Sequence, residues 1–194
     1  MIKIELHITC NALTSNQIET FENFCYSIDS KPIVILLSSG ENKQQPMISK
    51  IISCKDKNDI KKELDFIKSK FKANGYRITR IKMEVAPWDI MEAEQMFNRK
   101  KENYFEWHGK INIENEKNAT LAISEFGGHI SRNVLKKNPN FKLVTIRDYG
   151  TEQDIKEKII KLKKGLDQIG INFIKEELEY CIFDSNVSLD KGWI

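Results

Sequence analysis

Hydrophobic and polar residues alternate along several short segments of the chain, a pattern typical of strands with one buried face. Two of these segments, 2–9 and 104–113, also share the motif Glu-x-His in the middle of the alternation. In each segment the polar residues fall on one parity, so their side chains share one face of the strand. These polar residues are Glu5, His7 and Thr9 in the first segment and Glu106, His108 and Lys110 in the second.

Between the strands, apolar residues recur every three or four positions, as in amphipathic helices. The clearest case is 57–73, where Ile60, Leu64 and Ile67 form one stripe and Gly75 suits a C-terminal cap. The pattern predicts further helices over 15–29, 116–126 and 152–168. It predicts further strands over 33–37, 47–53, 77–85, 130–136, 141–147 and 172–183.

The predicted elements follow the order strand, helix, strand, strand, helix, strand twice, which is the order of the ferredoxin-like unit. Short matches between the two halves keep one constant offset: Asp59 with Asp154 and Gly75 with Gly170. The sequence therefore predicts an α+β fold made by tandem duplication of a ferredoxin-like unit, with two lobes related by pseudo-twofold symmetry. We place the first lobe at 1–88, a linker at 89–103 and the second lobe at 104–194.

In a ferredoxin-like unit the helices cover one face of the sheet and leave the other face open. The polar positions of 2–9 and 104–113 would lie on these open faces. Buried charged groups without partners are costly, so polar open faces favour a groove between the lobes over direct contact.

Composition narrows the class of protein but does not reveal its activity. The 194-residue chain has 40% hydrophobic residues and a net charge of +3, which fits a soluble globular protein without a strong preference for polyanions. No run reaches the roughly 20 apolar residues of a membrane span, and no phosphate-binding loop is present. The four cysteines lie far apart, and the start of the chain does not resemble a signal peptide, so we expect reduced thiols and a cytoplasmic location.

The predicted groove brings together the residues that can carry chemistry. Two histidines across a cleft can act as general base and general acid, because imidazole titrates near neutral pH. Threonine, lysine and arginine can hold a phosphate and offset charge on its oxygens. The catalytic candidates are His7 and His108, and the ligand-binding candidates are Thr9, Lys50, Lys110, Arg147, Glu5 and Glu106.

The tripeptide His7-Ile8-Thr9 resembles the His-x-Thr motif of the 2H phosphoesterases, which are two-lobed and use one such motif in each lobe. The resemblance implies cleavage of phosphodiesters by the paired histidines. It covers three residues, and the second copy departs from it because Lys110 stands where the family has serine or threonine. We therefore assign the chain to no family on this ground.

The leading hypothesis is recognition of a phosphate-bearing ligand, such as a nucleotide or an RNA end, with hydrolysis as a further step that the histidines would support. The competing hypothesis is a non-catalytic binding or protein-interaction module, in which each histidine only pairs with neighbouring charges. The two histidines and two glutamates would also suit zinc, manganese or iron, but Lys110 and Arg147 nearby argue against a metal. We expect no cofactor, and the sequence indicates no specific protein partner.

Overall fold

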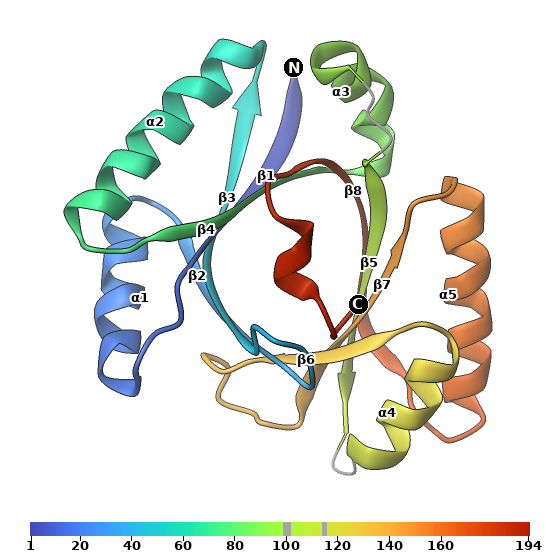
Figure 1. Ribbon diagram of the computed structural model, residues 1–194. Helices are drawn as coiled ribbons and strands as arrows, with labels where there is room; N and C mark the ends of the chain where they lie inside the picture. The colour runs from blue at the N-terminus through green and yellow to red at the C-terminus, as the bar shows by residue number, and fades with distance from the viewer. Residues whose placement is uncertain (99–101, 114–115) are drawn as a thin grey trace.

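The computed structural model describes residues 1–98, 102–113 and 116–194. The strands in these ranges are β1 (Ile2–Cys10), β2 (Lys31–Leu37), β3 (Gln44–Cys54), β4 (Ile78–Val85), β5 (Tyr104–Asn112), β6 (His129–Asn133), β7 (Phe141–Asp148) and β8 (Phe173–Asp184). They form one closed barrel in the order β1-β3-β2-β6-β7-β5-β8-β4, and every neighbouring pair is antiparallel (Figure 1).

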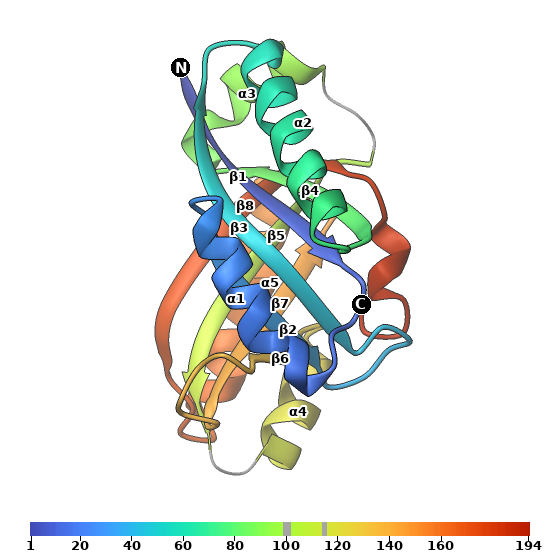
Figure 2. The same cartoon turned by 90° about the vertical axis from the view of Figure 1, so that its left-hand side faces the viewer.

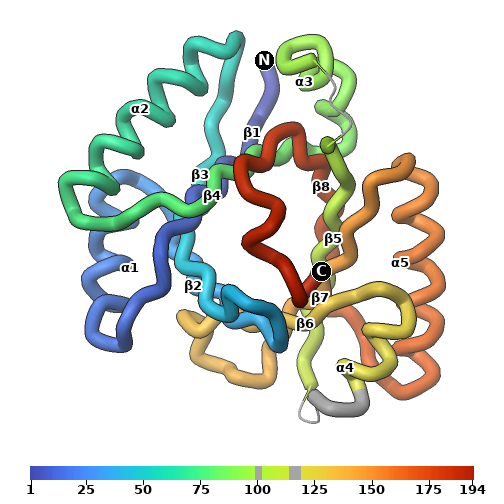
Figure 3. Tube along the Cα trace, viewed as in Figure 1, coloured from blue at the N-terminus to red at the C-terminus, as the bar shows by residue number. Residues whose placement is uncertain are grey.

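The helices lie on the outside of the barrel. They are α1 (Ile18–Ser27), α2 (Lys57–Ala73), α3 (Ile90–Phe97), α4 (Glu116–Glu125) and α5 (Glu152–Asp167), with short 3-10 turns η1 (Ser15–Gln17), η2 (Pro87–Asp89) and η3 (Val187–Asp190). Helices α1 and α2 flank one side of the barrel, and α4 and α5 flank the opposite side (Figure 3). The two longest helices begin at side-chain caps, Asp56 for α2 and Thr151 for α5, which accept hydrogen bonds from otherwise unpaired backbone amides.

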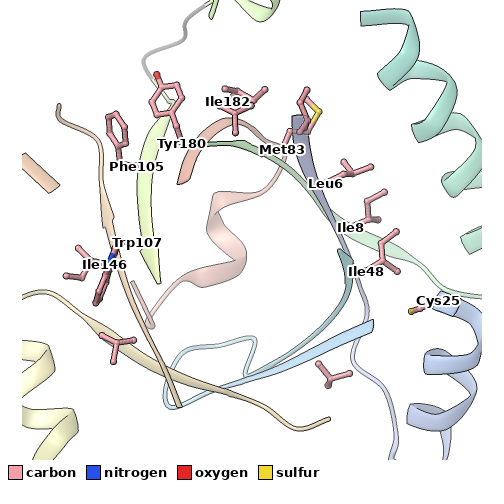
Figure 4. Close-up of a cluster of buried hydrophobic side chains, with 14 of the residues drawn as sticks. Leu6, Ile8, Cys25, Ile48, Met83, Phe105, Trp107, Ile146, Tyr180 and Ile182 are labelled. Atoms are coloured by element: carbon pink, nitrogen blue, oxygen red, sulfur yellow. The ribbon is translucent and has the colours of Figure 1, made fainter. Parts of the chain in front are cut away.

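The hydrophobic core lies between the barrel wall and the helices rather than inside the barrel. Leu6, Ile8 and Ile48 point outward from β1 and β3 toward α1 and α2, and Trp107 and Ile146 point outward on the other side (Figure 4). All five side chains are almost completely buried. Because strand side chains alternate between faces, the intervening polar residues point into the barrel.

The prediction of two tandem ferredoxin-like lobes is wrong, because the chain forms one closed antiparallel barrel. The edges of the two predicted sheets pair with each other: β2 pairs with β6 through Ile35 opposite Asn133, and β4 pairs with β8 through Val85 opposite Tyr180. An unpaired edge exposes a row of backbone donors and acceptors, and closure satisfies them. The faces that were expected to border a groove between lobes are therefore the inner surface of one barrel.

The division into 1–88, 89–103 and 104–194 stays a prediction, and residues 99–101 of that linker lie outside the described residues. In the part of the chain that the structure describes, no helix combines the length and the apolar character that a bilayer crossing requires.

Residues 187–194 follow β8 and lie across one end of the barrel. Seen along the barrel axis they fill the opening, and seen from the side they lie at one end of it (Figures 1 and 2). We call this stretch the closing segment. It contains η3 and the buried side chains of Leu189, Asp190 and Trp193.

Candidate ligand-binding cavity

The barrel encloses a cavity of about 350 Å³ to which strands of both halves contribute side chains. His7 from β1 and His108 from β5 both line it. Each histidine points inward because the residues on either side of it point outward; Leu6 and Ile8 flank His7 and are fully buried against the helices.

His7 is held between two carboxylates. Its Nε2 lies 2.9 Å from Glu5 Oε1, and its Nδ1 lies 3.3 Å from Glu84 Oε2. Ser49 donates a second hydrogen bond, of 2.6 Å, to the same oxygen of Glu5. The hydrogen bond from His7 is the main reason that the pKa of Glu5 falls to about 2, with the Ser49 hydroxyl adding to it against the opposing effect of burial.

His108 has looser surroundings. Its Nδ1 lies 3.0 Å from Thr145 Oγ1, while its Nε2 is 3.5 Å from Glu106 and 3.7 Å from Glu179. The side chain of His108 is 27% exposed, against 14% for that of His7. His108 therefore presents more of its ring to the cavity.

Lys82 connects the two histidine sites. It is buried on β4, where its Nζ lies 2.8 Å from Glu84 and also pairs with Glu106. Burial by itself would lower the pKa of Lys82, but Glu106 and Glu84 outweigh burial and raise it, so the lysine stays charged. A continuous network thus runs from His7 through Glu84, Lys82 and Glu106 to His108.

Glu179 adds a further buried carboxyl to this wall. It lies opposite Glu106 in the pairing of β5 with β8 and is 8% exposed. Burial, together with the charges of Glu84 and Glu5, raises the pKa of Glu179 to about 10. We therefore expect Glu179 to carry a proton at neutral pH, which relieves the repulsion among the carboxylates of the wall.

At the end of the cavity near the closing segment, two buried arginines share one carboxylate. Asp190 accepts hydrogen bonds from Arg147 Nη2 at 2.7 Å and from Arg80 Nη1 at 3.2 Å. Each arginine also has a carboxylate of the barrel: Arg147 pairs with Glu106 at 2.8 Å, and Arg80 Nε donates to Asp184 at 2.9 Å. Burial alone would lower the pKa of both guanidinium groups, but these carboxylates raise it, so both remain cationic.

The remaining wall of the cavity is apolar. Ile33 and Ile35 of β2, Met47 of β3 and Leu143 of β7 face the cavity and are only partly buried. Partial exposure of four apolar side chains toward one enclosed space is typical of a ligand pocket.

Lysines surround the end of the cavity that is opposite the closing segment. The two ends can be told apart along β2, since the closing segment contacts Ser39, just beyond the end of the strand, whereas Lys31 begins it. The lysines that line this end are Lys31, Lys110, Lys136, Lys142 and Lys175. Glu176 and Glu177 also line this end, and Glu177 pairs with Lys175 at 2.7 Å, so cations predominate there. We call this end the lysine rim.

Most of the sequence-predicted candidates meet in this cavity. Those that line it are His7, His108, Thr9, Lys110, Arg147, Glu5 and Glu106. Lys50 does not join them, because it lies on the outer face of β3 opposite Leu6. Its Nζ donates to Ile28 O at 3.1 Å and pairs with Glu63 of α2 at 2.9 Å. Ser49 occupies the inward position that sequence reasoning gave to Lys50.

Sequence reasoning missed several charged residues of the wall. Arg80, Lys82 and Glu84 alternate with apolar residues along β4, and this alternation was the signal that could have identified them. Asp190 had no such signal, because it lies in a segment outside the strands. Among the described residues, no group of three or more histidine, cysteine, aspartate or glutamate side chains is arranged to hold a metal ion.

Comparison with known proteins yields little. No family model matches the chain. No curated protein matches it either. Among solved structures, a mutant chlorite dismutase from Candidatus Nitrospira defluvii is similar over 97% of this chain and 92% of its own, with 10% sequence identity and a TM-score of 0.32. A likeness at that level supports no argument about function.

Proposed function

We propose that the protein binds a small anionic molecule with an apolar body inside the barrel. The observation that carries this proposal is the division of the cavity into an apolar wall, a hydrogen-bonding wall and a lysine rim. The volume of about 350 Å³ falls in the range of small-molecule sites. A ring of lysines attracts anions and raises their local concentration at the entrance.

The charges of the cavity favour one orientation of the ligand. Its anionic group would stay at the lysine rim, because Glu5, Glu84 and Glu106 would repel an anion from the histidine wall. Its apolar body would contact Ile35 and Leu143. A neutral polar group of the ligand would face His108, whose ring is the more exposed of the two.

Phosphate is one of the anionic groups that this site would suit, so a nucleotide or another phosphate-bearing molecule belongs to the proposal. Hydrolysis does not, since both nitrogens of His7 already face carboxylates, which leaves no position beside that ring for a phosphate. We therefore propose binding, and not phosphodiester cleavage, as the function of the cavity.

The proposal is tested by thermal unfolding with matched ligands. Decanoate, decanol and decylamine share an apolar chain and differ in charge, and 4-nitrophenyl phosphate and adenosine monophosphate add phosphate groups. We expect the anions to raise the melting temperature more than the neutral and cationic analogues. Equal stabilisation by all three decyl compounds would remove the role of the lysine rim, and stabilisation by none of the five would overturn the proposal.

Two substitutions locate the binding. Ile35→Glu places a charge on the apolar wall and should abolish the ligand-induced shift. Ile174→Glu is the matched control, because Ile174 is 56% exposed and does not line the cavity. Replacing Lys31, Lys136 and Lys175 by glutamine should weaken binding of anions, whereas the same change at Lys61, Lys62 and Lys68 of α2 should not.

A further inference from the structure

We infer that Arg80 and Arg147 form an anion site at the closed end of the cavity. Asp190 of the closing segment fills this site as an internal ligand. A carboxylate or phosphate group of a bound molecule takes its place when the segment moves away. The inference rests on the proposed function only in that the incoming ligand is an anion. Asp190 would then compete with ligands and keep this end of the barrel closed in their absence.

The three side chains form a buried, preformed binding site. The side chains of Arg80, Arg147 and Asp190 are 6%, 2% and 3% exposed. Both oxygens of Asp190 are engaged, since Oδ2 lies 3.0 Å from Arg80 Nη1 and Oδ1 accepts from Gln45 Nε2 at 3.0 Å. Two guanidinium groups and an amide that converge on one carboxylate form a pattern that also recognises a free carboxylate or phosphate.

The charge balance explains why the site needs an occupant. Asp184 and Glu106 belong to the barrel and partner one arginine each. Asp190 is the additional carboxylate between the two, and it comes from outside the strands. Without it, two buried cations would face each other with an unfilled space between them, which is unfavourable unless another anion enters.

The closing segment can leave without breaking the barrel. Among the described residues, one backbone hydrogen bond joins it to a distant part of the fold, from Glu41 N to Lys191 O at 3.2 Å, and a second, from Leu189 N to Asn186 O, joins it to the residue that precedes it. Apart from the contacts of Asp190, its other attachments involve side chains. Trp193 Nε1 donates to Ile130 O at 3.1 Å, and Ser39 Oγ donates to Gly192 O at 3.1 Å. Asn42 and Gln45 donate to Leu189 O at 3.3 and 3.5 Å, and Lys191 pairs with the exposed Glu41. None of the strand pairings that close the barrel involves this segment.

The anion site is continuous with the proposed ligand cavity. Arg80, Arg147, Asp190 and Trp193 line the same space as the two histidines. A ligand long enough to reach from the lysine rim past the apolar wall would therefore bring a second anionic group to the position of Asp190. The preferred occupant would be a molecule with acidic groups at both ends.

Chemical rescue tests the anion site without any cavity ligand. In Asp190→Ala the missing carboxylate should lower the melting temperature, and formate, which fits the space left by the side chain, should restore roughly half of the loss or more at concentrations above its dissociation constant. Sodium chloride at equal ionic strength is the control for screening. Acetate should act in the same way on Asp190→Gly, where one more methyl group fits.

A matched variant distinguishes loss of the Asp190 carboxylate from a general loosening of the closing segment. Glu41→Ala removes the exposed ion pair of 2.8 Å that Glu41 makes with Lys191 of the closing segment, and this variant should show no rescue by formate. Failure of formate to stabilise Asp190→Ala, or to permit its refolding if it does not fold alone, would overturn the anion site. Equal stabilisation of the wild type by formate would overturn it too.

Displacement of the segment is tested with Trp193→Ala, which keeps Asp190 and removes the main apolar attachment. Inorganic phosphate should stabilise this variant several-fold more strongly than the wild type, because Asp190 competes less well once the segment is loosened. An unchanged response to phosphate would show that Asp190 is a fixed structural group. These outcomes do not depend on the lysine rim or on Ile35, so they are distinct from failure of the proposed function.

Discussion

His7 and His108 have the same local motif, yet the barrel gives them different surroundings. His7 lies between Glu5 and Glu84, with Nε2 2.9 Å and Nδ1 3.3 Å from their oxygens. His108 makes one close contact, with Thr145, and its Nε2 is 3.5 Å or more from carboxylates. The strands that neighbour each histidine cause the difference, since β4 brings Glu84 to His7 and β7 brings Thr145 to His108. Of the two rings His7 is therefore the more tightly held, and we expect His108 to be the one that a ligand meets.

The largest effect should come from breaking the network at Glu106, on the His108 side. Glu106→Ala removes the buried carboxylate that partners both Lys82 and Arg147, and it should lower the free energy of unfolding by about 3–5 kcal/mol. Glu5→Ala, the equivalent change on the His7 side, should cost about 1–2 kcal/mol because Glu5 is 26% exposed and, among the described residues, pairs with no buried lysine or arginine. Urea denaturation of both variants measures the comparison, and equal losses would contradict it.

Substitution of His7 should mainly affect stability, and substitution of His108 should mainly affect binding. His7→Ala leaves Glu5 and Glu84 without the ring between them and should destabilise the protein by about 1–2 kcal/mol. His108→Ala should change stability by less than about 1 kcal/mol, since only the Thr145 contact is close, but should weaken binding of the ligands that stabilise the wild type. The measurements are urea denaturation and titration calorimetry. If His7→Ala weakened ligand binding more than His108→Ala, His7 would be the ring that contacts the ligand, and the prediction would be wrong.

The carboxylates beside the histidines should respond to pH with opposite signs. The folded-state pKa of Glu5 is about 2, below its usual 4.5, so its contribution to stability is present above pH 4.5 and is lost as pH falls toward 2. The folded-state pKa of Glu179 is about 10, so its contribution is full below pH 4.5 and is lost as pH rises toward 10. Glu179→Gln should therefore raise stability at pH 8 and flatten the alkaline side of the pH profile.

Thermal unfolding between pH 3 and pH 9 tests this pair. Glu5→Gln should flatten the acidic side. It should also make the alkaline loss smaller, because the charge of Glu5 helps to raise the pKa of Glu179. If Glu179→Gln instead lowered stability at pH 8, its carboxyl would be ionised in the folded protein, and the account of the wall would be wrong.

The sequence pattern determined the faces of single strands but not the way strands meet. Strict alternation in residues 2–9 predicted that Glu5 and His7 share a face, and both line the cavity. Closure of the barrel depends on the pairing of β2 with β6, whose partners are almost a hundred residues apart, as in Leu37 with Ser131. No local pattern reports such a contact, and the isolated ferredoxin-like lobes were predicted for that reason.

Lys50 illustrates the same limit within one strand. The stretch around it contains Ile48, Ile51 and Ile52, which occupy both parities, so alternation does not define the inner face of β3. The contacts of Asp190 could not be predicted from the sequence for a different reason, since its partners Arg80 and Arg147 lie on strands far away in the sequence. The functional roles given to the site residues stay predictions.

The smallest effect on stability should come from substituting single lysines on the outer and inner faces of the barrel wall. These substitutions compare a lysine outside the cavity with one that lines it. Lys50→Met removes an ion pair with Glu63 on the outer face and should cost at most about 1 kcal/mol, with no change in ligand binding. Lys110→Met, on the inner face, removes a cation that lies 3.7 Å from the ring of Phe141 and should cost a similar amount. It should in addition weaken binding of anionic ligands, because Lys110 belongs to the lysine rim. Calorimetry with decanoate measures the difference, and equal affinities in the two variants would mean that the rim does not select the ligand.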